Sequence, residues 1–328
     1  MTSPLASSFR SLQAIISLTQ LTSLHLSLNL EKFAQLDIPT GLSTLQCLQS
    51  LGIYNHSFSP LGSPDAGRDL LRGISTNLTR LGLLSVVDGF PDVAVLRHLQ
   101  MLESSRWGSA RSEAIASSNL TLSGTQLTWL QCLECSEVGE DHVPAFRSIS
   151  RLTSLQTLMI SAEGSNDFLE DEFFWSADLL QTMLQPLQSL TALQLCGMEM
   201  QTLPACLATL RLSALAVADN QLLGLPPGSY LASLEFLDIS WNSFESVPVC
   251  LLHCTCLQHL LVSSRIADFH GVLPQLHVQQ PDLENIAAAQ AACRSMYQLE
   301  HCSMTMSREG VSDCSRERPV RNIVTLPP

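Results

Sequence analysis

Aliphatic residues recur at a fixed interval through most of this 328-residue chain, and this period is the strongest constraint on its fold. The clearest unit has the pattern L-x-x-L-x-I-x-x-N-x-F and runs from Leu234 to Phe244. Equivalent units start at Leu190 and Leu212, each 22 residues before the next, and a further unit starts 23 residues later, at Leu257. A period in the twenties restricts the chain to an array of similar units, each of which packs on its neighbours.

The spacing inside each unit predicts a strand with one buried face. In L-x-x-L-x-L the second and third leucines are two residues apart, so a strand directs both to the same side. Parallel strands from successive units lie about 4.8 Å apart and would bury these leucines in one continuous interior. The residue between the two leucines points to the opposite side, which faces solvent.

The signature resembles the leucine-rich-repeat (LRR) family. The match is closest over residues 185–262 and good over 36–58. Less regular units start at Leu21, Leu78, Leu99, Leu127 and Leu155. The resemblance implies an α/β fold, a curved leucine-rich-repeat solenoid of about ten irregular repeats. Its parallel β-sheet would line the concave side, and short helices or turns the convex side. Units of 22–23 residues followed by Leu-Pro or Val-Pro resemble the typical intracellular class.

The residues at the ninth position of the repeat predict that a stabilising ladder of asparagine side chains is interrupted. In the LRR family this position usually holds an asparagine that bonds to the backbone of neighbouring turns. Only Asn29, Asn220 and Asn242 occupy it here, whereas other units have residues such as Trp107 or Met198. We therefore expect the asparagine ladder to be broken and the central curvature to be irregular.

Departures from the period predict the domain organisation. Longer spacings mark insertions near 56–76 and 163–185, where loops would leave the array. Beyond Pro281 the pattern stops, and Asp282 is placed to cap a helix. The expected parts are an N-terminal flank over 1–20, the solenoid over 21–277, a C-terminal helix or cap over 278–302, and a polar, disordered tail over 303–328.

We expect no catalytic residues, no cofactor and no metal site. The sequence has no P-loop, G-x-G-x-x-G, G-x-S-x-G or H-E-x-x-H motif. One segment offers residue types that bind Zn²⁺, namely Cys250, His253, Cys254, Cys256 and His259. The repeat register directs these side chains to different sides, which favours ordinary packing. Cys132 and Cys135 form a C-x-x-C pair without a second pair to complete a zinc site.

The eleven cysteines favour a reducing compartment, because they are odd in number and scattered through the repeats. Free cysteine behaves as a small hydrophobic residue in protein cores. The N-terminus has Arg10 inside it and polar residues between the apolar ones, unlike a signal peptide. The predicted location is cytoplasmic. The alternative is the cytoskeleton or a ciliary axoneme, where similar LRR proteins occur.

Charge and hydropathy limit the classes of partner. The formal net charge is −13, with 30 acidic residues against 17 basic ones. A nucleic-acid binder would show a basic stripe, and the sequence has none, so we expect no nucleic-acid partner. No apolar stretch reaches the length of about 18 residues that a membrane-spanning helix needs, so we expect no membrane insertion.

The outward strand positions are the candidate partner-binding residues. The place between the strand leucines is assigned to His25, Tyr54, Arg80, Glu103, Gln131, Met159, Gln194, Ala216, Asp238 and Leu261. Flanking places add Trp129, Leu133, Phe236, Ser240 and His259. A row with few charges suits a protein partner contacted by shape and a few anchors. The alternative is that these are tolerated surface residues of an irregular array.

The insertion over 163–178 is the second candidate contact. It combines six acidic residues with aromatic ones, among them Phe173 and Trp175, and has no basic residue. This composition suits docking to a basic, grooved partner, with the aromatic side chains as buried anchors. The alternative is that the aromatic side chains pack back onto the solenoid.

The resemblance implies a non-enzymatic, monomeric scaffold or adaptor that binds a protein partner through the concave face of the solenoid. Two alternatives stay open. The chain could be a structural protein of the cytoskeleton or axoneme. It could also be the sensor fragment of a larger receptor or multidomain protein.

Overall fold

The structure is a computed structural model that describes a defined part of the chain. The described residues are 15, 17–28, 42, 44–55, 74, 76–84, 96–105, 126–133, 143–162, 175–245, 248–263 and 321–325. Most of the predicted insertion near 56–76, residues 163–174 and the predicted helix in 278–302 lie outside them. The chain divides into two compact units, Met1–Met198 (unit 1) and Glu199–Pro328 (unit 2).

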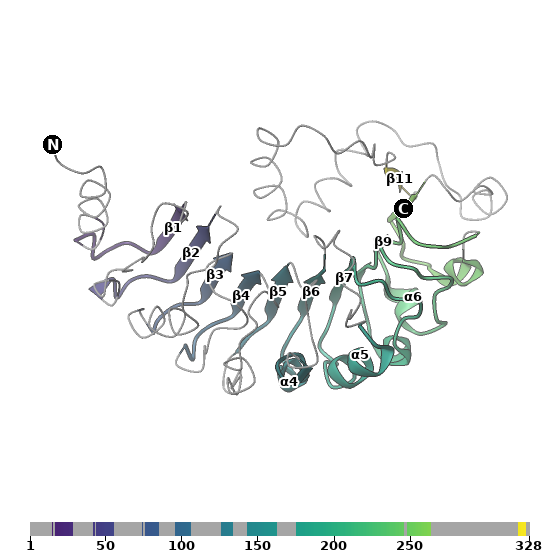
Figure 1. Ribbon diagram of the computed structural model, residues 1–328, viewed down its shortest axis with the longest axis horizontal. Helices are drawn as coiled ribbons and strands as arrows, with labels where there is room; N and C mark the ends of the chain where they lie inside the picture. Colours follow the sequence, from purple (N-terminus) through teal and green to yellow (C-terminus); the bar gives the residue numbers. More distant parts are fainter. Residues whose placement is uncertain are drawn as a thin grey trace, which may run out of the picture. The chain divides into compact units, whose positions relative to one another are not determined.

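Unit 1 is built on a parallel sheet whose strands follow one another in sequence order (Figure 1). Its strands are β1 (Ser23–Leu28), β2 (Ser50–Asn55), β3 (Arg80–Leu84), β4 (Met101–Ser105), β5 (Trp129–Leu133), β6 (Thr157–Ser161) and β7 (Ala192–Cys196). Each strand belongs to one predicted repeat. Because neighbours in space are neighbours in sequence, the sheet grows by one strand per repeat.

A recurring backbone contact sets the register between successive strands. The carbonyl of the residue before the start of one strand accepts two N–H groups from the start of the next. Thr79 O accepts from Gln100 N at 2.9 Å and from Met101 N at 3.0 Å. Gln100 O accepts in the same way from Thr128 N at 2.9 Å and from Trp129 N at 3.1 Å. This repeated contact aligns equivalent residues of neighbouring repeats side by side.

The interior of unit 1 is the predicted seam of aliphatic side chains. Leu102, Leu130, Leu158 and Leu193 are paired in register on adjacent strands and are fully buried. On β5, β6 and β7 a second inward residue follows two positions later, and this residue is also buried, for example Ile160 on β6. The alternation of inward and outward residues in the strands therefore confirms the strand assignment made from the spacing.

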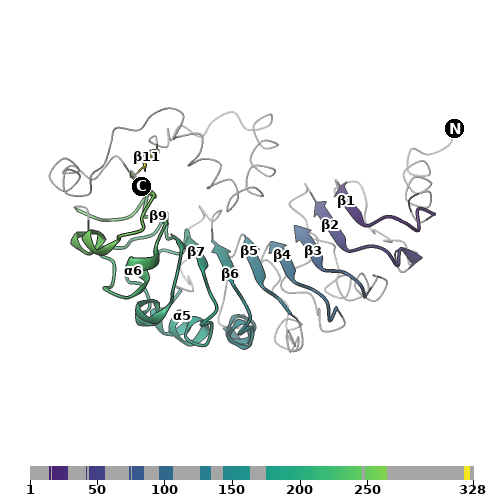
Figure 2. The same ribbon diagram turned by 180° about the vertical axis from the view of Figure 1, so that it is seen from behind.

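Short helices form the other side of the later repeats in unit 1. They are α4 (Val143–Ser148), η4 (Ile149–Arg151) and α5 (Ala177–Leu184). The Ser176 hydroxyl accepts from Leu179 N at 3.1 Å and so caps the N-terminus of α5. Figures 1 and 2 show α4 and α5 along the side of this unit away from its strands.

Unit 2 continues the repeat pattern with shorter elements. Its parallel strands are β8 (Ala214–Ala216), β9 (Phe236–Asp238) and β10 (His259–Ser263), and its helices are η5 (Ala205–Thr209), α6 (Tyr230–Ser233) and η6 (Val249–His253). A further strand, β11 (Arg321–Thr325), pairs antiparallel with β10. This strand lies in the segment 303–328, for which the composition predicts a tail without regular structure.

Asn220 and Asn242 of unit 2 make the backbone contacts expected of asparagines at the ninth position of the repeat. Asn220 Oδ1 accepts from Met200 N at 3.1 Å, and Asn242 Oδ1 accepts from Leu222 N at 3.0 Å. Asn242 Nδ2 also donates to Val217 O of the preceding repeat at 2.8 Å. Trp241, the residue before Asn242, has a left-handed φ of 57°, and so the turn before this asparagine is tight. Such a conformation costs about 1–2 kcal/mol in a residue with a Cβ.

The described residues contain one parallel strand for each predicted repeat, with the predicted leucines buried between strands and helices. These features define a leucine-rich-repeat fold. No disulfide joins the cysteines in the described part, of which Cys132, Cys196 and Cys206 are buried. Among the same residues, no helix has the length and hydrophobicity needed to cross a lipid bilayer.

The buried aliphatic interior predicts that alanine substitutions at two leucines of unit 2 lower the stability by very different amounts. Leu237 is fully buried, whereas the side chain of Leu223 is 72% exposed. Leu237→Ala should lower the free energy of unfolding by about 2–5 kcal/mol because it leaves a cavity between repeats. Leu223→Ala, the matched control, should change it by less than about 0.5 kcal/mol. Denaturant unfolding followed by circular dichroism measures both, and equal effects would contradict the assigned interior.

Candidate functional site

The outward residues of unit 1 form a row across the middle of the strands, which we call the central row. In chain order it holds His25, Gly52, Gly82, Glu103, Gln131, Met159 and Gln194. The sequence-based assignment of Tyr54 and Arg80 to this row is wrong by two residues. Leu51 and Ile53 point inward, so the residue between them, Gly52, takes the central place, and Gly82 does so on the next strand.

The two glycines leave room that the Tyr54 side chain occupies. A Cβ on Gly52 would stand 2.8 Å from Tyr54 Cε2 and 2.5 Å from His25 Cδ2. The rings of His25 and Tyr54 are stacked, with centroids 6.2 Å apart. Tyr54 therefore lies over the central row although its backbone belongs to the flank. A side chain at residue 52 would displace this ring pair.

Glu103 lies over the second glycine from the opposite direction. Its Oε2 atom is 3.1 Å, and Tyr54 Oη 3.5 Å, from the point where a Cβ of residue 82 would stand. The Glu103 side chain is 8% exposed, and Oε2 has no hydrogen-bond partner among the described residues. Burial raises the pKa of Glu103 from 4.5 to about 7, while the positive charge of Arg80 acts in the opposite direction.

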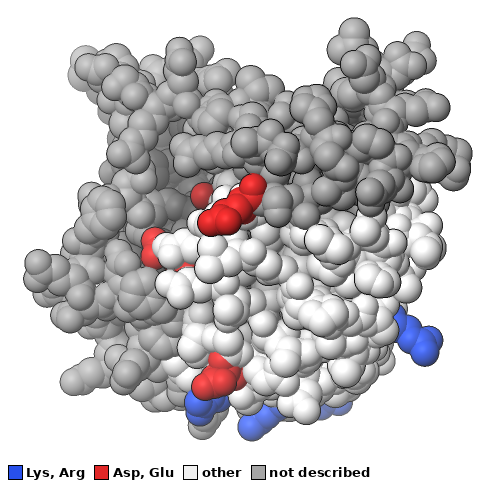
Figure 3. All heavy atoms as spheres, turned by 90° about the vertical axis from the view of Figure 1, so that its right-hand side faces the viewer, with Lys and Arg blue, Asp and Glu red and all other residues white. Residues whose placement is uncertain are grey.

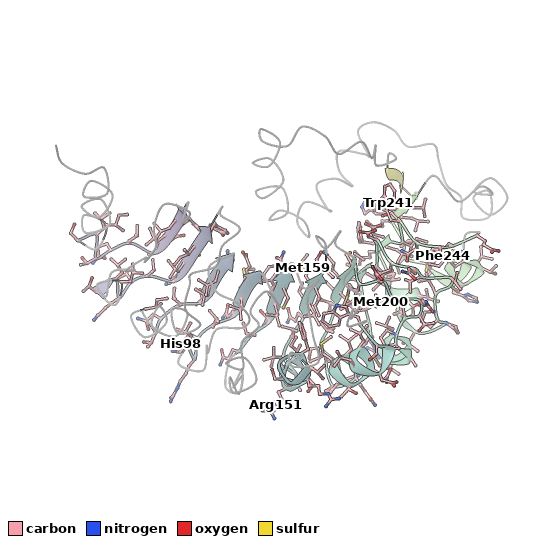
Figure 4. The ribbon with its side chains drawn as sticks, viewed as in Figure 1. His98, Arg151, Met159, Met200, Trp241 and Phe244 are labelled. Carbon is pink, nitrogen blue, oxygen red and sulfur yellow. The ribbon has the colours of Figure 1, made fainter. Side chains whose placement is uncertain are left out.

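Two glutamines extend this arrangement along the sheet. Gln131 is 1% exposed and Gln194 is fully buried. In the described residues, Gln131 Oε1 and both polar atoms of the Gln194 side chain lack hydrogen-bond partners. Met159 lies between them in the row, and Figure 4 shows it on the strand side of the unit, with Arg151 on the helical side. We call Glu103, Gln131 and Gln194 the acceptor row.

A second outward row lies beside the central row and is more accessible. We call it the leading row, and it comprises Ser50, Arg80, Met101, Trp129, Thr157 and Ala192. Arg80 is exposed, and Trp129 and Thr157 are half-buried. The strand face of unit 1, by which we mean these two rows, thus combines an accessible edge with buried polar atoms that have unused hydrogen-bonding capacity.

The sequence-predicted residues of unit 2 are more enclosed. Phe236 is 5% exposed and Asp238 is fully buried. Asp238 Oδ1 accepts from Ser240 N at 2.9 Å and from Ser240 Oγ at 2.6 Å, so this carboxylate holds the turn after β9. His259 Nδ1 is buried without a partner among the described residues, and burial lowers the pKa of His259. Figure 3 shows a mostly uncharged surface on the described residues at one end of the molecule.

The described end of the acidic-aromatic insertion packs against the repeats. Trp175 is 6% exposed, and its ring meets Phe146 of α4 edge-on, with centroids 4.6 Å apart and an interplanar angle of 78°. This geometry stabilises aromatic pairs beyond the area that they bury. Trp175 therefore offers little surface to a partner. Phe173 lies outside the described residues.

Four thiols in the described part of the chain do not have the lowered pKa of catalytic nucleophiles. Burial raises the pKa of Cys206 to about 11 and that of Cys254 to about 12. Burial also raises the pKa of Cys250 and Cys132. A reactive thiol requires a lowered pKa. Within the described ranges, no three His, Cys, Asp or Glu side chains gather in a way that could hold a metal ion.

No family model and no curated protein matches the chain. Its structure is similar to that of an LRR protein from Leptospira interrogans, with 23% identity and a TM-score of 0.49, over 74% of this chain and 55% of that chain. It is also similar to an internalin, InlF, from Listeria monocytogenes, with 16% identity and a TM-score of 0.40, over 79% of this chain and 82% of that chain. The functional domain of InlJ from Listeria monocytogenes, which includes a cysteine ladder, has 14% identity and a TM-score of 0.33, over 76% of this chain and 65% of that chain. The chain thus spans little more than half of the Leptospira protein.

Sequence reasoning missed the two glycines and the burial of the acceptor row. The glycines were detectable, because the motif applied strictly to Leu81 and Leu83 places Gly82 between them. The burial of Glu103 has no comparable signal, since a glutamate at an outward strand position is ordinarily solvated.

The raised pKa of Glu103 predicts a pH-dependent stability. The folded state favours the protonated form, so the stabilisation is fully present below the unfolded pKa of 4.5 and is lost as the pH rises through about 7. Glu103→Gln should remove this loss of stability, which is on the order of 3 kcal/mol. The measurement is the free energy of unfolding of both proteins at several pH values across this range.

The control for this prediction is Glu235→Gln, which changes an exposed glutamate of unit 2. Its pH dependence should follow that of the unchanged protein. A parallel pH dependence for Glu103→Gln and the unchanged protein would show that Glu103 is solvated in solution.

Proposed function

We propose that this chain is a non-enzymatic scaffold that binds a protein partner through the strand face of unit 1. One observation supports this proposal above others: buried polar atoms with unused hydrogen-bonding capacity lie in register beside an accessible leading row. A buried acceptor without a partner costs about 1–3 kcal/mol. A partner that supplies donors would recover this energy on binding.

The leading row offers the anchors that such a contact needs. Trp129 and Met101 pair in register on adjacent strands, and both are half-buried. Aromatic and methionine side chains are enriched at the centres of protein interfaces. Because successive repeats present equivalent positions about 4.8 Å apart, an extended segment of a partner could contact several strands at once.

The proposal includes a cytoplasmic monomer. Free cysteines in the described part of the chain, several of them buried, support a reducing compartment. The burial of Trp175 against Phe146 favours packing over docking for the insertion at 163–178, so the strand face is the primary candidate.

A selection experiment tests the strand face. Peptides selected from a random display library for binding to this protein should lose binding to Thr157→Arg, because a long charged side chain would then project from the leading row beside Trp129. The matched control is Thr182→Arg, which places the same residue on the exposed side of α5. Binders that tolerate Thr157→Arg, or that lose affinity equally for both variants, would contradict the proposed site.

A further inference from the structure

We infer that the acceptor row binds a cationic, donor-rich side chain, an arginine or lysine presented by an extended basic segment of the partner. This inference rests on the proposed function and specifies the chemistry of the partner at the same site.

The unused atoms determine the type of ligand. Of the acceptor-row atoms that lack a partner within the described part of the chain, Glu103 Oε2, Gln131 Oε1 and Gln194 Oε1 are acceptors and Gln194 Nε2 is a donor. A guanidinium or ammonium group has several N–H donors and no acceptor, so it complements this set. An aspartate or glutamate of a partner would instead place oxygen against oxygen.

Charge favours the same class of ligand. The chain has a net charge of −13, which raises the local concentration of cations around it. Arg80 on β3 is exposed, and its positive charge acts on Glu103. It does not bond to Oε2, which has no partner among the residues that the structure describes, so a partner could donate to this oxygen.

The local geometry brings two polar groups together above Gly82. The carboxyl of Glu103 and the hydroxyl of Tyr54 both lie within 3.5 Å of the point where a Cβ of this residue would stand, so a head group that binds Glu103 would lie close to both. Trp129, two residues before Gln131 on the same outward side of β5, offers a half-buried aromatic ring. Guanidinium groups stack on aromatic faces.

The spacing of the row indicates the length of the bound segment. Glu103 on β4 and Gln194 on β7 are three strand steps apart, which corresponds to about 14 Å. An extended peptide covers this distance with about four residues. A segment with a basic residue at one end could therefore reach Glu103 and both glutamines, with Met159 beneath its middle.

Fluorescence anisotropy with a labelled hexa-arginine peptide tests the inference on the full-length protein. Glu103→Gln should weaken binding by about tenfold or more, because it removes a charged acceptor. Glu235→Gln removes the same charge at an exposed position of unit 2 and should weaken binding by less than about twofold. Gly82→Ala should also weaken binding, since its methyl group would stand 3.1 Å from Glu103 Oε2 and displace this carboxyl. Its control is Gly224→Ala, where a methyl group would meet open space.

A second readout does not depend on the absolute affinity. Binding of hexa-arginine should strengthen as the pH rises through about 7, because Glu103 then becomes charged in the free protein. Among the described residues, the titratable groups near Glu103 are Arg80 on the neighbouring strand β3 and the Tyr54 hydroxyl on β2, one strand further along the sheet. Glu103→Gln should abolish this rise, and circular dichroism confirms that the variant is folded.

The outcomes separate this inference from the proposed function. Equal weakening by Glu103→Gln and Glu235→Gln would show attraction by the overall charge alone and would overturn the inference, as would the absence of measurable hexa-arginine binding. If the library peptides still depend on Thr157 but contain no basic residue and tolerate Glu103→Gln, the proposed function stands and the inference fails. If no peptide depends on Thr157, the proposed function itself fails.

Discussion

The burial of two alternating aliphatic residues per repeat is the constraint on which the other features of this protein depend. In unit 1 the side chains at Leu102, Leu130 and Leu158 exclude water from the same interior, and their strands are therefore held in register. A shift of one residue would turn every buried leucine outward. The same register determines which residues lie on the outward side, so the candidate binding face follows directly from the packing of the interior.

The stability that the buried leucines provide offsets the cost of unpartnered polar groups on the strand face. Leucines supply the favourable burial, whereas Glu103, Gln131 and Gln194 are buried with atoms that have no partner among the described residues. Unsatisfied buried groups are rare in folded proteins because each one costs free energy. Their alignment along one row in unit 1 is the observation behind the proposed role in recognition, in which a partner would complete these hydrogen bonds.

The sequence predicted most of the fold because the relevant signal is local and repeated. The positions of β7, β8 and β9 follow from the three most regular units, and the contacts of Asn220 and Asn242 follow from the ninth position of the motif. The outward residues were harder to predict. The assignment of Tyr54 and Arg80 to the central row is wrong, because Gly52 and Gly82 lie between the inward residues of their strands.

Two features could not be predicted from the repeat pattern, because they depend on contacts between residues far apart in the sequence. The position of the Tyr54 ring depends on the missing side chains at Gly52 and Gly82, 30 residues apart in the chain. The burial of Trp175 depends on Phe146, which belongs to a helix of the preceding repeat. The pattern determines which residues point outward, and the contacts among their side chains determine what the surface can bind.

The arrangement of Tyr54 over the two glycines is the most direct test of this account. Nuclear Overhauser contacts between the ring protons of Tyr54 and the α-protons of Gly52 and Gly82 can be measured in solution with selectively labelled protein. The account predicts strong contacts to Gly52, because a Cβ there would lie 2.8 Å from Tyr54 Cε2, and weaker ones to Gly82. Contacts from Tyr54 to the buried leucines instead would show that β2 has the opposite register and would contradict the assigned binding face.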